Sequence, residues 1–234
     1  MRARGFTLIE ILVVVAIIVL LAAVLLVSFS GVFSKSENAQ AQATIETLKS
    51  NIANFETRWG IAPPGNLNDL GVLVGYPGLS DPNNENTGIE AMVLALRSRR
   101  EQGPYIDAPL FQNDKRRTNL DIDTVLESAC APNYLDIEDG TARDLFEIVD
   151  PWGNPYVYID IKTLQMGGFA YTVTLGNGGT VNINATEAQD SLRHPVTGSF
   201  PTGYALWSFG EDGVNDYGRG DDITSWPKYE STDE

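Results

Sequence analysis

The chain opens with a long apolar stretch that follows a lone acidic residue. Residues 11–27 are all apolar, and no charged side chain lies between Glu10 and Lys35. As a helix, the uncharged run from Ile11 to Ser34 would measure about 36 Å at roughly 1.5 Å per residue. A bilayer's hydrocarbon core is about 30 Å thick. The pattern predicts a membrane-spanning helix.

A secretory signal or a plain membrane anchor is the main alternative for this segment, because two arginines before a hydrophobic stretch are typical of both. A signal-peptide apolar region is shorter, about 7–15 residues, and ends at a small-residue cleavage site. Arg2 and Arg4 lie on the short N-terminal side, which predicts a cytoplasmic N-terminus and an external location for everything after Lys35. Glu10 is costly in a membrane unless it is paired, so we expect it to meet a partner.

The helical pattern continues beyond the apolar stretch. From Ser36 to Trp59 there is no Gly or Pro. Apolar residues recur there at steps of four and three, which predicts one face of an amphipathic helix: Ala41, Ile45, Leu48, Ile52, Phe55 and Trp59. Gly60 and the prolines at 63 and 64 would end the helix. A continuous helix from Phe6 to Trp59 would be roughly 80 Å long.

The remaining part of the chain is large enough for one domain with its own core. Residues 66–86 are rich in Gly, Pro, Asn and Asp and are predicted to form a loop. Residues 87–96 are expected to form a short helix with one buried face. Helices are also predicted at 122–129 and 141–149.

From Asp150 onward the pattern changes to β-branched and aromatic runs between turn-forming residues. These runs predict strands at 156–161, 169–175 and 204–209, and thus an antiparallel sheet of three or more strands. Helices followed by strands indicate the fold class α+β, with the sheet packed on the striped helix.

The composition is strongly acidic, with 16 Lys and Arg against 31 Asp and Glu and a net charge of −15. This charge makes nucleic acid an unexpected partner. Two short basic runs, 97–100 and 115–117, are interpreted as solvated ends of loops or helices. Cys130 is the only cysteine, so no intramolecular disulfide can form, and we expect it to be buried.

The hexapeptide Gly5-Phe6-Thr7-Leu8-Ile9-Glu10 resembles the class III signal of type IV pilins and type II secretion pseudopilins. The resemblance implies that prepilin peptidase cleaves between Gly5 and Phe6 and N-methylates Phe6. Glu10 would then be the fifth residue of the mature protein. In a filament, its carboxylate would pair with the N-terminal amine of the next subunit, so that two charges among apolar helices neutralise each other.

This resemblance divides the chain into four parts. Residues 1–5 would be the leader, 6–34 the transmembrane and filament-core half of the helix, and 35–60 its amphipathic half. Residues 61–234 would be a periplasmic globular head that contains the C-terminal calcium-loop region. The fold implied is that of type IV pilins, a long N-terminal helix packed on a C-terminal antiparallel sheet.

A second string, from Asp150 to Tyr156, reads Asp-Pro-Trp-Gly-Asn-Pro-Tyr. Its prolines and its Gly-Asn pair predict a double turn that feeds a strand. It resembles the same segment of major pseudopilins of type II secretion. Many type IV pilins close their C-terminal region with a disulfide, which this chain cannot do. Both features favour a pseudopilin.

The segment 208–226 places four aspartates among four glycines: Asp212, Asp216, Asp221 and Asp222. Ca²⁺ takes six to eight oxygen ligands, and glycines let backbone carbonyls turn inward beside carboxylates. An acidic solvated turn is the alternative. The segment is not an EF-hand, because Val214 stands at the third ligand position.

The same segment resembles the calcium-binding C-terminal loop of major pseudopilins, including the ending from Asp222 to Trp226. The resemblance implies a Ca²⁺ site with Asp212, Asp221 and Asp222 as carboxylate ligands. Asp216 is a further candidate, and backbone carbonyls at 206–209 would supply other oxygens. The ion would replace the missing covalent clamp.

The function implied is structural. The subunit would be an inner-membrane, single-pass protein with a cytoplasmic N-terminus and a periplasmic head. Prepilin peptidase would process it, and it would polymerise with minor pseudopilins on an inner-membrane platform into a periplasmic pseudopilus. No catalytic motif is found and His194 is the only histidine, so we expect no enzyme.

Two other functions stay open: a type IV pilin in a surface fibre for adhesion, motility or DNA uptake, and a membrane-anchored, calcium-dependent binding module that never polymerises. Extra segments at about 97–149 and 176–203 depart from compact major pseudopilins. They would form a partner-binding surface or mark a specialised or minor subunit.

Overall fold

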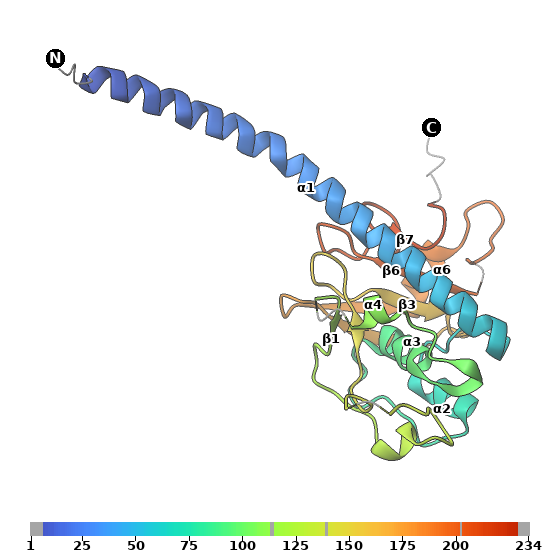
Figure 1. Cartoon of the computed structure of the whole chain (residues 1–234). Helices are drawn as coiled ribbons and strands as arrows, with labels where there is room; N and C mark the ends of the chain where they lie inside the picture. The colour runs from blue at the N-terminus through green and yellow to red at the C-terminus, as the bar shows by residue number, and fades with distance from the viewer. Residues whose placement is uncertain (1–6, 113–114, 139, 202, 229–234) are drawn as a thin grey trace.

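A computed structural model describes residues 7–112, 115–138, 140–201 and 203–228, apart from the side chains of 24–33, 108 and 109. Helix α1 (Leu8–Trp59) extends far beyond a globular head built from the rest of the chain (Figure 1). The predicted leader and the cleavage site between Gly5 and Phe6 lie outside the described residues.

Helix α1 is continuous over 52 residues, about 78 Å at 1.5 Å per residue. Its predicted stripe is confirmed, because Ala41, Ile45, Leu48 and Ile52 are fully buried against the head and Phe55 is nearly so. Trp59 is half-buried and stacks on Phe55. Gly60 ends the helix as predicted, in the left-handed conformation with φ 73°.

The N-terminal part of α1 has a bare apolar surface. Its large apolar side chains are 49–83% exposed: Leu8, Ile9, Ile11, Leu12, Val13, Val14, Val15, Ile17, Ile18, Val19, Leu20 and Leu21. The predicted membrane segment also includes residues 24–33, whose side chains lie outside the description. Across the described residues, no helix combines the length and the apolar character needed to cross a membrane.

The central sheet has three antiparallel strands in the order β3 (Val157–Asp160), β6 (Tyr204–Ser208) and β7 (Ile223–Thr224). All three predicted strands are present, but they do not share one sheet. The predicted strand at 169–175 is β4 (Ala170–Thr174), which pairs with β5 (Thr180–Asn184) in a separate hairpin. The Gly-rich turn at 176–179 brings these two strands together.

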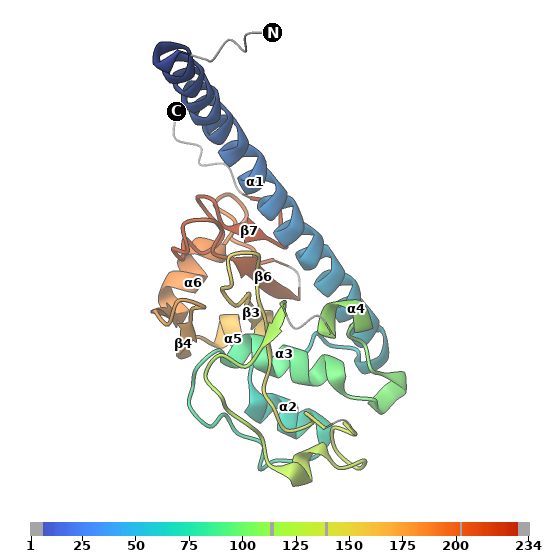
Figure 2. The same cartoon turned by 60° about the vertical axis from the view of Figure 1, so that its left-hand side comes forward.

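Both faces of the central sheet are covered. Successive side chains of a strand point to opposite faces, and those of β3 enter two different hydrophobic cores. Tyr156 and Tyr158 point to the core formed with α1 and α3 (Thr87–Arg97), and the Tyr156 hydroxyl donates to the Ala41 carbonyl at 3.2 Å. Val157 and Ile159 point the other way, toward α5 (Ile161–Met166), the β4–β5 hairpin and α6 (Ala185–Leu192). Figure 2 shows α1 alongside β6 and β7, with α6 beyond them.

The predicted helix at 87–96 is confirmed as α3, but it is buried on every side rather than on one face. Helix α2 (Leu67–Val74), which forms within the segment 66–86 that was wrongly predicted to be all loop, packs on it. The extra segment at 97–149 wraps around α3. This segment contains several short elements: η1 (Arg100–Gln102), α4 (Ala108–Phe111), β1 (Arg117–Thr118), η2 (Glu127–Cys130) and β2 (Glu147–Ile148). The segment is part of the core and not only an added surface.

The helices predicted at 122–129 and 141–149 are wrong. Only a 3₁₀ turn at 127–130 and the short strand β2 form there. Asn119 exchanges two hydrogen bonds with the backbone of Asp123, accepting from its N–H and donating to its carbonyl. Such side-chain bonds compete with helix formation.

The basic run at 97–100 was predicted to be solvated, but the structure buries part of it. Arg97 is 4% exposed. Its guanidinium donates to the carbonyls of Thr141 at 2.8 Å and Asp144 at 2.9 Å, and it lies over the rings of Phe111 and Phe146. Arg97 therefore fastens the extra segment to the end of α3.

We predict that Arg97→Ala lowers the free energy of unfolding by about 2–4 kcal/mol, because it leaves two carbonyls without a charged donor and removes ring contacts. The matched change Arg99→Ala should cost less than about 1 kcal/mol, since Arg99 is exposed and forms surface ion pairs with Asp136 and Glu138. Urea denaturation of the full chain in detergent measures both. Equal effects would contradict the anchoring role of Arg97.

Candidate functional site

The N-terminal tip of α1 holds the carboxylate of Glu10. Thr7 is the N-cap of the helix, and its backbone N–H and hydroxyl both donate to Glu10 Oε2 at 2.8 Å. The Glu10 N–H donates back to the Thr7 hydroxyl at 3.3 Å, which completes a capping box. The Glu10 carboxylate is therefore held by Thr7, the residue directly after the predicted mature terminus at Phe6.

The C-terminal loop, residues 209–222, connects β6 to β7 and contains the four predicted aspartates. Asp222 is fully buried at its centre, where its Oδ2 accepts from the N–H groups of Gly218 at 2.7 Å and Asp216 at 3.2 Å. Its Oδ1 is buried and has no hydrogen-bond partner among the described residues. Burial, with the charges of Asp216 and Asp221, raises the pKa of Asp222 to about 7.

The other carboxylates of the C-terminal loop shape its backbone. Asp221 Oδ2 accepts from the N–H groups of Glu211 at 2.9 Å and Asp212 at 3.2 Å. Asp212 Oδ1 accepts from Val214 N–H at 2.8 Å. Gly210 packs closely on the Asp221 carboxylate with φ 69°, so a side chain there would collide with it.

The carboxylate oxygens of this loop suit a cation such as Ca²⁺, which prefers oxygen ligands. Asp222 offers a buried oxygen without a partner among the described residues, and the loop contains three more aspartates. The backbone at 206–209 is partly occupied, because the Leu206 carbonyl accepts from Ser225 N–H at 2.9 Å. Among the described residues, no three of these four aspartates have carboxylate oxygens that all lie within 4.8 Å of one another.

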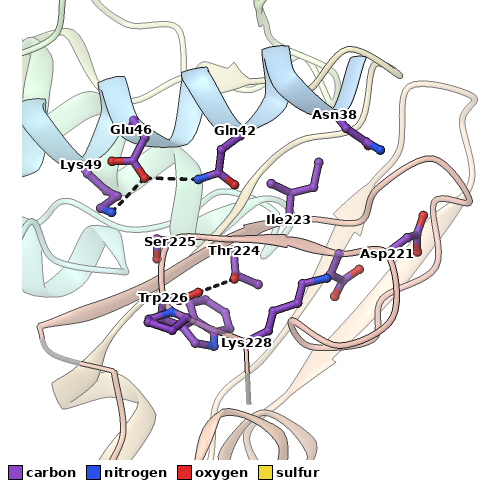
Figure 3. A pocket seen from close by; sticks show the side chains of 12 residues that line it. Asn38, Gln42, Glu46, Lys49, Asp221, Ile223, Thr224, Ser225, Trp226 and Lys228 are labelled. Carbon is purple, nitrogen blue, oxygen red and sulfur yellow. Dashed lines mark hydrogen bonds and ion pairs between the residues drawn. The ribbon is translucent and has the colours of Figure 1, made fainter. Parts of the chain in front are cut away.

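The C-terminal loop and the segment after it lie against α1. The Ser34 hydroxyl donates to Glu211 Oε2 at 2.5 Å. A cleft of about 660 Å³ separates Asn38, Gln42 and Glu46 of α1 from residues 221–228 (Figure 3). The loop predicted to hold calcium therefore contacts α1 at Ser34 and faces its amphipathic half across this cleft.

The turn at 150–156 meets the same region. Asp150 Oδ1 accepts from the N–H groups of Trp152 at 3.0 Å and Asn154 at 2.9 Å, which confirms the predicted turn. Its Oδ2 accepts from the Ser208 hydroxyl at 2.6 Å, at the end of β6. The two segments that resemble major pseudopilins thus contact each other, although they lie far apart in the sequence.

The structure also gathers three carboxylates that the sequence had not indicated: Glu90, Asp121 and Asp123. Their ligand oxygens lie within 4.8 Å of one another. The Asp-x-Asp spacing was a possible signal, but Asp123 lies in the segment 122–129, which was predicted to form a helix. The prediction that Cys130 is buried is confirmed. His194 Nδ1 accepts from the N–H groups of Val196 and Thr197 in its own turn.

Two comparisons place the chain among known proteins. The family described as the prokaryotic N-terminal methylation motif matches residues 1–26. A fimbrial protein of Neisseria meningitidis serogroup A is 28% identical over 141 residues, which cover 51% of this chain and 81% of that protein. No solved structure matches the chain.

The motif and the relative together support the type IV pilin-like and pseudopilin family. The class of protein they support is a type IV pilin-like filament subunit. The α+β head and the long N-terminal helix agree with this class.

We predict that Asp150→Ala lowers the free energy of unfolding by about 2–4 kcal/mol, because it leaves the N–H groups of Trp152 and Asn154 and the Ser208 hydroxyl without their acceptor. Asp190→Ala is the matched control at an exposed position and should change it by less than about 0.5 kcal/mol. Denaturant titration of the full chain in detergent compares the two. A loss no greater than that of the control would show that the turn does not depend on this carboxylate.

Proposed function

We propose that this protein is a pseudopilin, a structural subunit of the periplasmic pseudopilus of a type II secretion system. Prepilin peptidase cleaves it between Gly5 and Phe6 and methylates Phe6. The precursor is anchored in the inner membrane by its N-terminal segment, and the processed subunit is then assembled with minor pseudopilins by an inner-membrane platform. The role is mechanical and not enzymatic.

The observation that carries this proposal is the division of α1 into two halves. One half is buried against the head, while the other presents the exposed apolar residues 8–21. A contiguous apolar surface of this kind needs a lipid or protein cover. Membrane lipid provides the cover before assembly, and the equivalent helices of neighbouring subunits provide it within a homopolymer.

The Glu10 carboxylate sets the axial position of one subunit on the next. In the isolated chain it is satisfied by the Thr7 cap and is exposed at the helix tip. Inside a bundle of apolar helices it would lose water, and the charged amine of a neighbour's Phe6 would compensate for that loss. Only one axial offset brings the two charges together.

Two features favour the pseudopilin over a type IV pilin. The C-terminal region contains no disulfide, since Cys130 is the only cysteine, and the turn at 150–156 packs on the end of β6 beside the acidic loop. The similarity to a fimbrial protein favours the second candidate, a type IV pilin in a surface fibre. A third candidate is an anchored, calcium-dependent binding module that never polymerises.

Calcium is proposed to fasten the C-terminal loop in place of a disulfide. Asp222 would be the central ligand, because one of its oxygens is buried without a partner among the described residues. Asp212, Asp216 and Asp221 would supply further oxygens. The ion would offset the mutual repulsion of these carboxylates and hold the loop against α1.

We predict that Glu10→Ala reduces filament assembly in cells at least about 10-fold while the head stays folded, because the neighbour's amine loses its counter-charge. Glu37→Ala, at the next acidic position along α1, is the matched control and should assemble normally. Shearing and sedimentation of filaments measure assembly, and mass spectrometry measures the mature N-terminus. A terminus other than methylated Phe6 would exclude processing at this site.

The same strains separate the candidate functions. A pseudopilin that loses Glu10 should leave exported proteins in the periplasm and show no loss of surface fibres. Loss of surface fibres with normal secretion would instead identify the type IV pilin. Unchanged behaviour in both assays would favour the anchored binding module.

We predict that Asp222→Asn weakens calcium binding at the C-terminal loop at least about 10-fold, because it removes the charge of the most buried ligand. Calorimetric titration of calcium into the chelator-treated full chain in detergent measures this, with Asp190→Asn as the control. If the Asp222 variant and the control give the same binding heats, calcium does not bind at this loop.

A further inference from the structure

Helix α3 contains one acidic residue, and that residue is in the core. Glu90 is fully buried, and neither of its carboxylate oxygens has a hydrogen-bond partner in the part of the chain that the structure describes. All eleven residues of α3 are buried. A carboxylate in such a place costs several kcal/mol unless a proton or a cation compensates for its charge.

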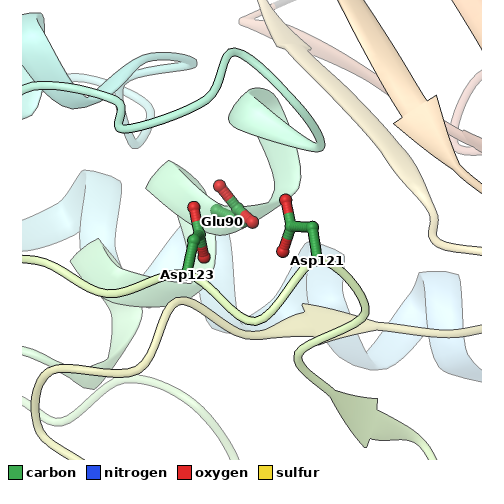
Figure 4. Close-up of side chains that lie close together, drawn as sticks. All are labelled: Glu90, Asp121 and Asp123. Atoms are coloured by element: carbon green, nitrogen blue, oxygen red, sulfur yellow. The ribbon is translucent and has the colours of Figure 1, made fainter.

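Two aspartates approach Glu90 from the extra segment that wraps α3 (Figure 4). Asp121 and Asp123 flank Ile122, whose φ of 60° and exposed side chain mark a sharp local turn. Asn119 stabilises this turn by its two bonds to the backbone of Asp123. The turn directs both carboxylates toward α3 and the isoleucine outward.

The three side chains leave five buried oxygens without hydrogen-bond partners over the described residues: both oxygens of Glu90, both of Asp123 and Oδ1 of Asp121. Asp123 is only 8% exposed. The remaining Asp121 oxygen accepts from Asn83 Nδ2 at 2.8 Å, which holds this carboxylate in place. Hydrogen bonds with Asn83 and Asn119 therefore hold the two aspartates in position beside Glu90.

The spacing of these oxygens suits one cation. One ligand atom from each of the three residues lies within 4.8 Å of the other two. Oxygens on opposite sides of a Ca²⁺ ion, each at about 2.3–2.6 Å, are up to about 5 Å apart. A single ion can therefore touch all three carboxylates without a large movement of the backbone.

Two further acidic residues, Glu147 and Asp81, lie near these three carboxylates. Burial raises the pKa of Glu90 well above its usual range, and the charges of the two aspartates, of Glu147 and of Asp81 raise it further. Glu147 is already satisfied, since it accepts from Asn86 Nδ2 at 2.9 Å and from Leu120 N–H at 3.1 Å. Asp81 accepts from the Thr87 hydroxyl and two N–H groups of its own turn. Both acids therefore have hydrogen-bond donors of their own, unlike the oxygens of Glu90, Asp121 and Asp123 that have no partner among the described residues.

We propose that Glu90, Asp121 and Asp123 form a binding site for a divalent cation of the size of Ca²⁺, which fastens the 119–125 segment to α3. Its ligands are oxygens alone, which suits Ca²⁺ or Mg²⁺ rather than zinc. Carboxylates that can bind through one or both oxygens suit Ca²⁺, whereas Mg²⁺ demands near-ideal octahedral geometry and retains several waters. The site is separate from the C-terminal loop and does not depend on filament assembly.

The test is a calcium titration of the chelator-treated full chain in detergent, followed by calorimetry and by the melting temperature. In the Asp222→Asn background, which weakens calcium binding at the C-terminal loop, one calcium-binding event of unchanged affinity should remain. Adding Glu90→Gln or Asp123→Asn should weaken that event at least about 10-fold. The same variants should remove at least about half of a calcium-dependent rise in Tm of roughly 5–10 °C, which is expected at calcium about 100-fold above the Kd of the unsubstituted site.

The matched control is Glu127→Gln, which removes one acidic charge from an exposed position of the same segment and should leave binding unchanged. Magnesium should bind more weakly than calcium to the Asp222→Asn protein. If Glu90→Gln prevents folding, Asp121→Asn, at a half-buried position, provides the same comparison. Calcium stoichiometry and Tm shifts that are the same with and without these carboxylates would overturn the proposal.

Discussion

The packing of one stripe of α1 on the head is the interaction on which the rest of the structure depends. Ile45, Leu48 and Ile52 are fully buried between the central sheet and α3, so the helix is part of the core and not a tether. Residues 8–21 of the same helix have no such cover and remain exposed. Since one rigid helix contains both halves, whatever surrounds the apolar half fixes the position of the head.

The head is organised around a sheet that is buried on both faces. Tyr156 and Tyr158 face α1 and α3, while Val157 and Ile159 face the β4–β5 hairpin and α6. The extra segment at 176–203 supplies part of the cover of the second face by forming β5 and α6, and the extra segment at 97–149 encloses α3.

Buried charges in this head are of two kinds. Arg97 is enclosed, but two carbonyls and two aromatic rings surround its guanidinium, so its charge contributes to the stability of the fold. Glu90 and Asp222 are equally enclosed, yet they keep oxygens without partners among the described residues. Burial without a donor is unfavourable for a carboxylate. The two acidic sites are therefore where a bound cation would stabilise the fold most.

The sequence by itself determined the long helix, its buried stripe, its end at Gly60, the three strand positions and the turn at Asp150, because each depends on local periodicity or turn chemistry. It could not determine that the strand at 169–175 leaves the central sheet, since strand pairing depends on distant partners. Nor could it show that the segment 97–149 encloses α3, or that Glu90 meets Asp121 and Asp123 across some thirty residues. Only tertiary packing decides which polar side chains lose water and which neighbours they find there.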